Sequence, residues 1–380
     1  DIDSDDREEL GVGNYDGYGP ARYGVIQQGN WIWNTTSSAV VNAKTTADTD
    51  GDGSPEILFG ARASSTWVRS YGSAPASRWS VTHGDWVDGS QRADTDGDGQ
   101  DEVAVVSGNR GDLTVIDDGR VQWQPQSPAN IEGLFGLTEV TGDDTPEILT
   151  HSPPNDDKQG LQLITKSDTG GVEVVWRAEP NAPVRATLSE LDSDTDASEE
   201  VIAAYPGRGL ITSLDAETGE MRWREQVASA DRVRFADVTG DETPEVLLWS
   251  DTTLRVFSAD SRSLIELSTS APILRATGSS SGSGDGTLLL LTDNALISRT
   301  AEEELTRIQI DGSQVNEMSV GDTDGDNNPE VALGTDGSLR LYDNLEMASS
   351  QLEFPSTPES ESESGVDVTR TVSADEVAPG

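Results

Sequence analysis

The sequence predicts an all-β protein, a seven-bladed β-propeller of four-stranded antiparallel blades. Three observations predict this fold. A short acidic motif recurs along the chain at intervals of 42 to 53 residues. Each copy is followed by short runs rich in β-branched residues and separated by glycine turns, as in consecutive hairpins. A tryptophan stands 14 to 16 residues ahead of most copies. A repeat of this length with four strands per unit is typical of propeller blades.

The repeat is most regular at the residue that closes each acidic motif and begins an apolar run. DTDGDGSPEILFG begins at Asp48, and DTDGDGQDEVAVV begins at Asp94. Seven units are marked in this way, and the sixth of them, GSSSGSGDGTLLLL, lacks the acidic residues. The closing positions are Glu56, Glu102, Glu147, Glu200, Glu245, Thr287 and Glu330.

Each unit is expected to place one strand before the acidic motif and three after it. In the second unit the later runs are EVAVV, LTVID and RVQW. The tryptophans would lie on fourth strands and pack between blades. Trp33 has no unit ahead of it, so we expect the strand around Trp31–Trp33 to complete the seventh blade and close the ring. The alternative is that Leu352–Phe354 supplies that strand.

The composition excludes several classes of function. The chain has 380 residues, 70 acidic and 25 basic side chains, and a formal net charge of −45. This charge excludes unaided binding to nucleic acid and argues against docking on an anionic membrane. Cysteine is absent, which excludes disulfides, zinc–thiolate sites and thiol nucleophiles. With three Lys against 22 Arg, the acidic, lysine-poor composition indicates a haloarchaeal protein, because concentrated salt screens self-repulsion.

The two ends of the chain differ from the repeats. Residues 1–20 are acidic, and residues 355–380 are rich in Ser, Glu and Pro. We therefore expect an acidic N-terminal tail at 1–20, the propeller at 21–354 and a linker or stalk at 355–380.

The acidic motifs read D-x-D-x-D-x-x-x-E, a pattern that can surround one cation with oxygen atoms. Side chains at positions 1, 3, 5 and 9 would converge with the carbonyl of position 7. Oxygen donors without nitrogen or sulfur select calcium or magnesium, and a flexible cage with this many carboxylates favours calcium. The alternative is that the acidic turns are only solvated surface, but six copies at matched positions favour metal.

The expected ligands form four strong Ca²⁺ sites and two weaker ones, in which threonine replaces the second aspartate. The strong sites use Asp48, Asp50, Asp52, Ser54 and Glu56; Asp94, Asp96, Asp98, Gln100 and Glu102; Asp192, Asp194, Asp196, Ser198 and Glu200; and Asp322, Asp324, Asp326, Asn328 and Glu330. The weaker sites use Glu139, Thr141, Asp143, Thr145 and Glu147; and Asp237, Thr239, Asp241, Thr243 and Glu245.

The DTDGDGSPEILFG-type units resemble the FG-GAP repeats of integrin alpha-subunit β-propellers and the related VCBS-type repeats of prokaryotic surface proteins. The likeness covers roughly residues 23–354. It implies stabilising calcium ions in loops that join the first and second strands on one face, and partners that bind the opposite face. His83, Trp86, His151 and Arg208 fall in expected loops on that opposite face and are candidates for a ligand surface.

One further motif suggests catalysis. Residues 278–282 read GSSSG, which matches the G-x-S-x-G nucleophile elbow but lies in a Ser/Gly-rich run without a strand–turn–helix context. We interpret it as a loop.

Two classes of function remain. The first is an extracellular, calcium-stabilised binding or adhesion module that recognises a protein or glycan at the cell surface without catalysis, anchored through a segment outside this sequence. The second is a propeller enzyme, either a polysaccharide lyase or hydrolase or a quinone-dependent dehydrogenase. A structural subunit of a surface assembly or virus particle is a variant of the first. We expect binding rather than catalysis, no nucleic-acid partner and no direct membrane insertion.

Overall fold

The computed structural model of the protein describes most of the chain. It covers residues 1–380 except 4, 6, 14–20, 38–39, 63–66, 83–86, 88, 107–110, 126–130, 132, 143–144, 153–159, 179–183, 190–199, 229, 242, 259–262, 281–285, 301–303, 311–314, 327–328, 336–337, 344–347, 354–367 and 372–380.

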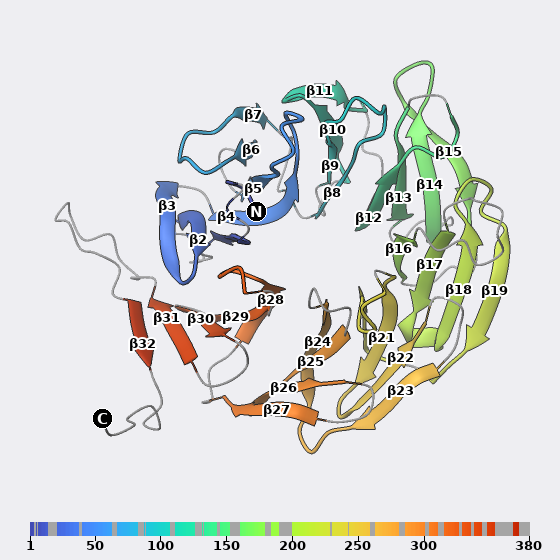
Figure 1. Ribbon diagram of the computed structural model, residues 1–380. Helices are drawn as coiled ribbons and strands as arrows, with labels where there is room; N and C mark the ends of the chain where they lie inside the picture. The colour runs from blue at the N-terminus through green and yellow to red at the C-terminus, as the bar shows by residue number, and fades with distance from the viewer. Residues whose placement is uncertain are drawn as a thin grey trace, which may run out of the picture.

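Eight antiparallel sheets stand around a common centre as the blades of a propeller (Figure 1). From the second sheet to the eighth, the first strand in sequence lies nearest the centre and the following strands lie successively further out. Within the part of the chain that the structure describes, no helix has the length and apolar character needed to cross a membrane.

The sheets follow one another in chain order. The first three contain β1 (Leu10–Gly13), β2 (Ala21–Gln27) and β3 (Asn30–Ser37); β4 (Val40–Ala47), β5 (Glu56–Arg62), β6 (Trp67–Tyr71) and β7 (Trp79–Thr82); and β8 (Gly89–Ala93), β9 (Glu102–Val106), β10 (Leu113–Asp117) and β11 (Arg120–Trp123). The fourth and fifth contain β12 (Gly133–Thr138), β13 (Glu147–Ser152), β14 (Gly160–Lys166) and β15 (Val172–Arg177); and β16 (Arg185–Ser189), β17 (Glu200–Tyr205), the 3₁₀ turn η1 (Pro206–Arg208), β18 (Leu210–Asp215) and β19 (Met221–Gln226). The last three contain β20 (Arg232–Ala236), β21 (Glu245–Ser250), β22 (Thr253–Phe257) and β23 (Ser263–Ser268); β24 (Ile273–Ser280), β25 (Gly286–Thr292), β26 (Ala295–Arg299) and β27 (Glu304–Gln309); and β28 (Val315–Gly321), β29 (Glu330–Thr335), β30 (Ser338–Asp343), β31 (Ala348–Glu353) and β32 (Val368–Thr371).

The hydrophobic core is divided into clusters that lie between neighbouring sheets. Strand β9 shows why its sequence, EVAVV, is almost wholly apolar. Val103 and Val105 pack into the cluster shared with the second sheet, whereas Ala104 and Val106 pack into the cluster shared with the fourth. Because successive side chains of a strand point to opposite faces, a strand between two other blades must be apolar on both. The apolar runs after each acidic motif are therefore second strands covered on both sides.

The expected number of blades, seven, is wrong, because the described residues form eight. The additional sheet is the first, β1-β2-β3. Its strand β1 lies inside the segment 1–20 and pairs with β2, with Leu10 opposite Ile26. The strand around Trp31–Trp33 is β3, which is the outer strand of this first sheet and not of the last one. This unit was not predicted, because the acidic residues of segment 1–20 were interpreted as a tail.

The last sheet takes its outer strands from the C-terminal part of the chain. Strand β31 pairs with β30, and β32 pairs with β31. The alternative for the closing strand, a segment at Leu352–Phe354, is therefore the better one, since Leu352 lies in β31 opposite Leu339. Phe354 itself lies outside the described residues.

Apolar packing between the first and the last sheet closes the ring. Ile26 of β2 packs with Ala332 of β29 and with Leu339 and Leu341 of β30. Partly buried side chains of β1 and β3 complete this cluster. The two sheets that are furthest apart in the sequence are thus neighbours in space, as Figure 1 shows.

Candidate metal centres

The acidic loops lie where the inner strand of a blade turns into its second strand. In the second sheet β4 ends at Ala47 and β5 begins at Glu56, and in the third sheet β8 ends at Ala93 and β9 begins at Glu102. The loops between β12 and β13, between β20 and β21 and between β28 and β29 have the same position. Since inner strands run in the same direction in every blade, these loops share one face of the propeller.

The loop between β8 and β9 wraps its backbone around the side chain of its first aspartate. Asp94 accepts the N–H of Gly97 on Oδ1 at 2.8 Å and the N–H of Gly99 on Oδ2 at 3.1 Å. Gly97 and Gly99 have φ angles of 74° and 88°, in the region that glycine adopts without steric cost. Asp96 and Asp98 each accept the N–H two residues further on, so every aspartate of the loop is oriented by its backbone.

Glu102 is the last residue of this acidic motif, and its side chain is fully buried. Its Oε2 accepts the N–H of Thr95 at 2.7 Å and the hydroxyl of Thr95 at 2.5 Å. Its Oε1 is also buried and accepts no hydrogen bond from the described residues. Burial raises the pKa of the Glu102 carboxyl group, although both hydrogen bonds from Thr95 lower it. A buried carboxylate oxygen without a donor is costly unless a cation lies beside it.

Among the described residues, four loops bring carboxylate oxygens close enough to hold one metal ion, with all the oxygens of a group within 4.8 Å of one another. The groups are Asp48, Asp50 and Glu56; Asp94, Asp96 and Glu102; Asp322, Asp324, Asp326 and Glu330; and Asp1, Asp3, Asp5 and Glu9. The first three belong to loops that the sequence predicted to be strong sites.

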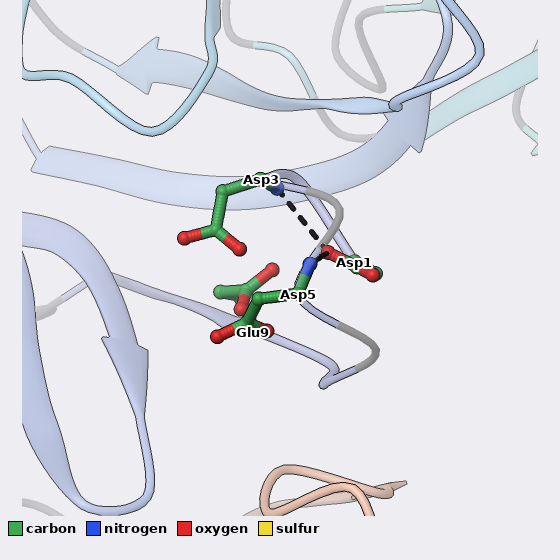
Figure 2. Close-up of side chains that lie close together, drawn as sticks. All are labelled: Asp1, Asp3, Asp5 and Glu9. Atoms are coloured by element: carbon green, nitrogen blue, oxygen red, sulfur yellow. Dashed lines mark hydrogen bonds between the residues drawn. The ribbon is translucent and has the colours of Figure 1, made fainter.

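The fourth group lies in the N-terminal segment and was not predicted as a site. Figure 2 shows its four side chains on one short loop, with Asp1 accepting the backbone N–H groups of Asp3 and Asp5 at 3.3 and 3.2 Å. The N–H of Ile2 donates to Glu9 Oε2 at 2.7 Å, as the N–H of Thr95 does to Glu102. Burial raises the pKa of Glu9 as well.

The sequence does carry a signal for this fourth group. Asp1, Asp3, Asp5 and Glu9 keep the D-x-D-x-D-x-x-x-E spacing, and Glu9 stands 47 residues before Glu56, which is one repeat length. Without the glycines of DTDGDG, the motif was taken for a run of solvated acids.

The two loops with threonine at position 3 satisfy their buried glutamates differently. The Thr141 hydroxyl donates to Glu147 Oε1 at 3.2 Å, and the Thr239 hydroxyl donates to Glu245 Oε1 at 3.3 Å. Each hydroxyl therefore meets the oxygen that is left without a donor in Glu102. Burial, together with the charges of Asp241 and Asp237, raises the pKa of Glu245 to about 7.

The other expected ligands have varied positions. Glu200 is buried and accepts the Ser213 hydroxyl at 2.5 Å. Asp52 and Asp98 belong to their loops but not to the closest oxygen groups. The residues at position 7 that are described, whose carbonyls were expected as ligands, are Ser54, Gln100, Thr145 and Thr243. Asp143, Asp192, Asp194, Asp196, Ser198 and Asn328 lie outside the described residues.

The loop of the second blade holds an arginine that sequence reasoning did not find. The guanidinium of Arg78 forms an ion pair with Asp50 and lies 3.5 Å from Asp52 Oδ2. Its Nε is 3.1 Å from Oε1 of Glu56, an ion-pair distance without hydrogen-bond geometry. Arg78 thus places a positive charge among the carboxylates of this loop. It reaches the loop from the connection between β6 and β7, and the spacing of the motif gives no sign of it.

The candidate ligand face is only partly described. Arg208 lies in η1, on the connection between β17 and β18, and is exposed. His151 was expected in a loop, but it is a buried residue of β13, opposite Gly133 and Leu161. His83 and Trp86 lie outside the described residues.

The GSSSG segment has a packing role at its first residue. Gly278 lies in β24, where a Cβ atom would collide with the carbonyl oxygen of Asp237 in the acidic loop of the preceding blade. Glycine is therefore required by close approach of two backbones, in a strand rather than in a strand–turn–helix elbow.

Solved structures of low sequence identity share this architecture. BamB from Moraxella catarrhalis is 14% identical, with 87% of this chain and 96% of that chain covered and a TM-score of 0.51. The dihydro-heme d1 dehydrogenase NirN in complex with DHE is 12% identical, with 88% of this chain and 71% of that chain covered and a TM-score of 0.58. BBS1N in complex with ARL6DN is 11% identical, with 79% and 90% covered and a TM-score of 0.51. The chain is a β-propeller. At these identities the likeness extends to the fold alone.

No protein-family model matches the chain, and no curated protein does. The resemblance to FG-GAP and VCBS-type repeats therefore rests on the acidic motifs and their place between first and second strands.

Proposed function

We propose that the protein is a calcium-stabilised β-propeller that acts as a non-catalytic binding module at the cell surface, where it recognises a protein or glycan. The observation that carries the metal part is the buried Oε1 of Glu102, which has no hydrogen-bond donor and lies within 4.8 Å of oxygens from Asp94 and Asp96. A cation bound there would neutralise a carboxylate that the fold has removed from water.

Calcium is the cation that fits this donor set best. The groups offer only oxygen ligands, and soft metal ions prefer sulfur or nitrogen ligands. Calcium bonds to oxygen are about 2.3–2.6 Å long, so ligands on opposite sides of one ion lie at most about 5 Å apart. The oxygens within 4.8 Å agree with that limit. The loops are largely exposed, which suits the weak sites of extracellular modules, where calcium is abundant.

The binding role is supported by the architecture and by the neighbours. Calcium held between the first and second strands of several blades leaves the opposite face of the ring available to a partner. The solved structure of BBS1N, which is similar in fold, is a complex with another protein, ARL6DN. We therefore place the partner of this protein on the face away from the acidic loops.

The metal part is tested by thermal unfolding in concentrated NaCl with either calcium or a chelator. A site at a calcium concentration a hundredfold above its Kd adds about 2.7 kcal/mol to the free energy of unfolding. We expect calcium to raise the melting temperature of the wild type. Glu102→Gln should show a smaller rise and bind one calcium fewer by calorimetry, while in chelator it should be at least as stable as the wild type because a buried charge is gone.

The matched control is Glu173→Gln, because Glu173 is an exposed residue of the outer strand β15. It should retain the full calcium effect and stoichiometry. Equal melting temperatures of the wild type in calcium and in chelator would refute structural calcium.

A further inference from the structure

A cavity of about 440 Å³ lies between the inner strands of the fifth, sixth and seventh blades. Arg185 is the first residue of β16 and Arg232 is the first residue of β20, and both line this cavity. Acidic loops follow the last residues of inner strands, so the first residues lie at the other face. The cavity is therefore on the face away from the metal centres, where we place the partner.

The lining is strongly positive in a chain whose formal net charge is −45. Four arginines, Arg185, Arg232, Arg234 and Arg275, line the cavity together with a single acidic residue, Asp231. Asp231 accepts the hydroxyl of Ser250 at 2.5 Å. Four arginines from three blades line this one cavity, which favours an anionic ligand.

Two of these arginines have donors that face solvent. Arg185 donates from Nη1 to its neighbour Val184, whose carbonyl oxygen is 3.2 Å away, and Arg232 donates from Nη1 to the carbonyl of Leu274 in the next blade. Both residues are exposed. A backbone carbonyl leaves the positive charge of a guanidinium in place, and each guanidinium has five N–H donors. Bidentate pairing with a carboxylate needs two of them.

Trp249 adds aromatic surface to the same cavity. It is 5% exposed and is one of the residues that line the cavity. Pro206 and Leu274 contribute further apolar surface.

We propose that this cavity binds an acidic saccharide, with the carboxylate of a uronic acid held by Arg185 and Arg232. The volume lies within the range of small-ligand sites, about 300–1,000 Å³, and far exceeds that of a simple inorganic anion. Sugar hydroxyls both donate and accept, so they can bond to the arginine donors and to Asp231 together. An acidic peptide fits less well, since each of its residues adds an N–H donor to a lining with one carboxylate acceptor.

This inference specifies the ligand of the proposed binding role and is independent of the metal sites. The test is calorimetric titration of the full chain, in calcium and 0.15 M and 1 M NaCl, with digalacturonate. Its methyl ester, which is neutral, and a tetraglutamate peptide are titrated in parallel. We expect digalacturonate to bind, the methyl ester to bind at least tenfold more weakly, and tetraglutamate to give no saturable heat. Affinity should fall at the higher salt concentration.

Variants locate the site. Arg185→Gln and Arg232→Gln should each weaken digalacturonate binding by roughly tenfold or more, the loss expected for a charge-assisted hydrogen bond. The matched control, Arg120→Gln, lies on the outer strand β11 with an 83% exposed side chain and should bind like the wild type. If a variant does not fold, saturation-transfer NMR of the wild type with digalacturonate decides whether the sugar binds.

Four outcomes would overturn the proposal: equal binding of acid and methyl ester, unchanged binding by both arginine variants, stronger binding of tetraglutamate, or an absence of digalacturonate binding. In that last case the calcium-dependent melting temperature would still report on the metal centres, and capture of a different ligand on this face would leave the binding role intact.

Discussion

In six acidic loops of the described part of the chain, the glutamate at position 9 accepts the backbone N–H of position 2. The distance from that nitrogen to Oε2 is 2.6–3.1 Å for Ile2, Thr49, Thr95, Val140, Val238 and Thr323. Because this bond satisfies one of the two carboxylate oxygens, the other must find a different partner. It meets a threonine hydroxyl in the two loops with threonine at position 3 and lies beside Arg78 in the second blade. We expect the identity of that partner to determine how much each loop depends on a cation.

Arg78 gives a prediction for the loop of the second blade. Without calcium, the Arg78 guanidinium supplies positive charge beside Asp50 and Glu56. We expect Arg78→Gln to lower the free energy of unfolding by about 1 kcal/mol in chelator, the upper end for a partly exposed ion pair, and by much less in saturating calcium. Chemical unfolding in the two conditions measures the difference. Arg120→Gln serves as the control, and an equal loss in both conditions would show that Arg78 and the cation do not substitute for one another.

The carboxylate groups of three acidic loops could be predicted from the sequence, because the acidic residues of one loop lie within nine positions and their spacing alone brings them together. Arg78 could not be predicted, since it reaches the loop from another turn of the blade. The cavity arginines had no local signal either. Arg185 and Arg232 stand in different repeats, and only the packing of consecutive blades makes them neighbours.

At the scale of strands and turns, tryptophans on outer strands join two of the blades to the blades that follow them. Trp33 donates from Nε1 to the carbonyl of Gly72 at 3.1 Å, and Trp176 donates to the carbonyl of Ala216 at 2.8 Å. Both acceptors lie in the turn between the third and fourth strands of the following blade. The expectation that these tryptophans pack between blades is confirmed for this pair.

The packing of Trp176 against the turn that contains Gly219 can be tested by substitution of that glycine. Its φ angle is +70°, and a Cβ atom would stand 2.6 Å from Cδ2 of Trp176. Gly219→Ala therefore combines backbone strain with overpacking, and we expect it to lower the free energy of unfolding by about 2 kcal/mol or more. Denaturant unfolding followed by tryptophan fluorescence measures this loss.

The control for that experiment is Gly207→Ala, because a Cβ at Gly207 would meet nothing within 4 Å. It should change stability by less than about 0.5 kcal/mol. Similar losses for the two variants would mean that the fit to Trp176 has no special role.

The strands themselves were predictable where apolar runs follow an acidic motif, because a strand between two blades is buried on both faces. Strand β1 was missed for a physical reason. Its sequence, LGVG, has two glycines and only partly buried side chains, so it carries little of the apolar, β-branched signal of the other second strands. The number of blades was wrong because this one element was not recognised.

At the scale of the whole molecule, the acidic loop of the first blade contacts that of the last blade in the same way as the loop of the third blade contacts that of the second. Glu8 donates its N–H to the carbonyl of Asp322 at 2.7 Å and accepts the N–H of Asp322 on Oε2 at 3.0 Å. Asp101 makes the same two bonds with Asp48, at 2.7 and 2.8 Å. Glu8 and Asp101 both occupy position 8 of their loops. The N-terminal unit is therefore built into the ring in the manner of an internal blade.

Ring closure is tested by removing the carboxylate of Glu8. Glu8→Ala deletes the acceptor of the Asp322 N–H, and we expect a loss of about 1 kcal/mol in the free energy of unfolding, the net contribution of one hydrogen bond. Because Ile26 packs against β29 and β30, the loosened junction should raise hydrogen exchange on both sides of it, in β1–β3 and in β28–β30. Glu173→Ala should change neither region. Faster exchange confined to β1–β3, with β28–β30 unaffected, would contradict this closure, because the last blade would then be stable without the first.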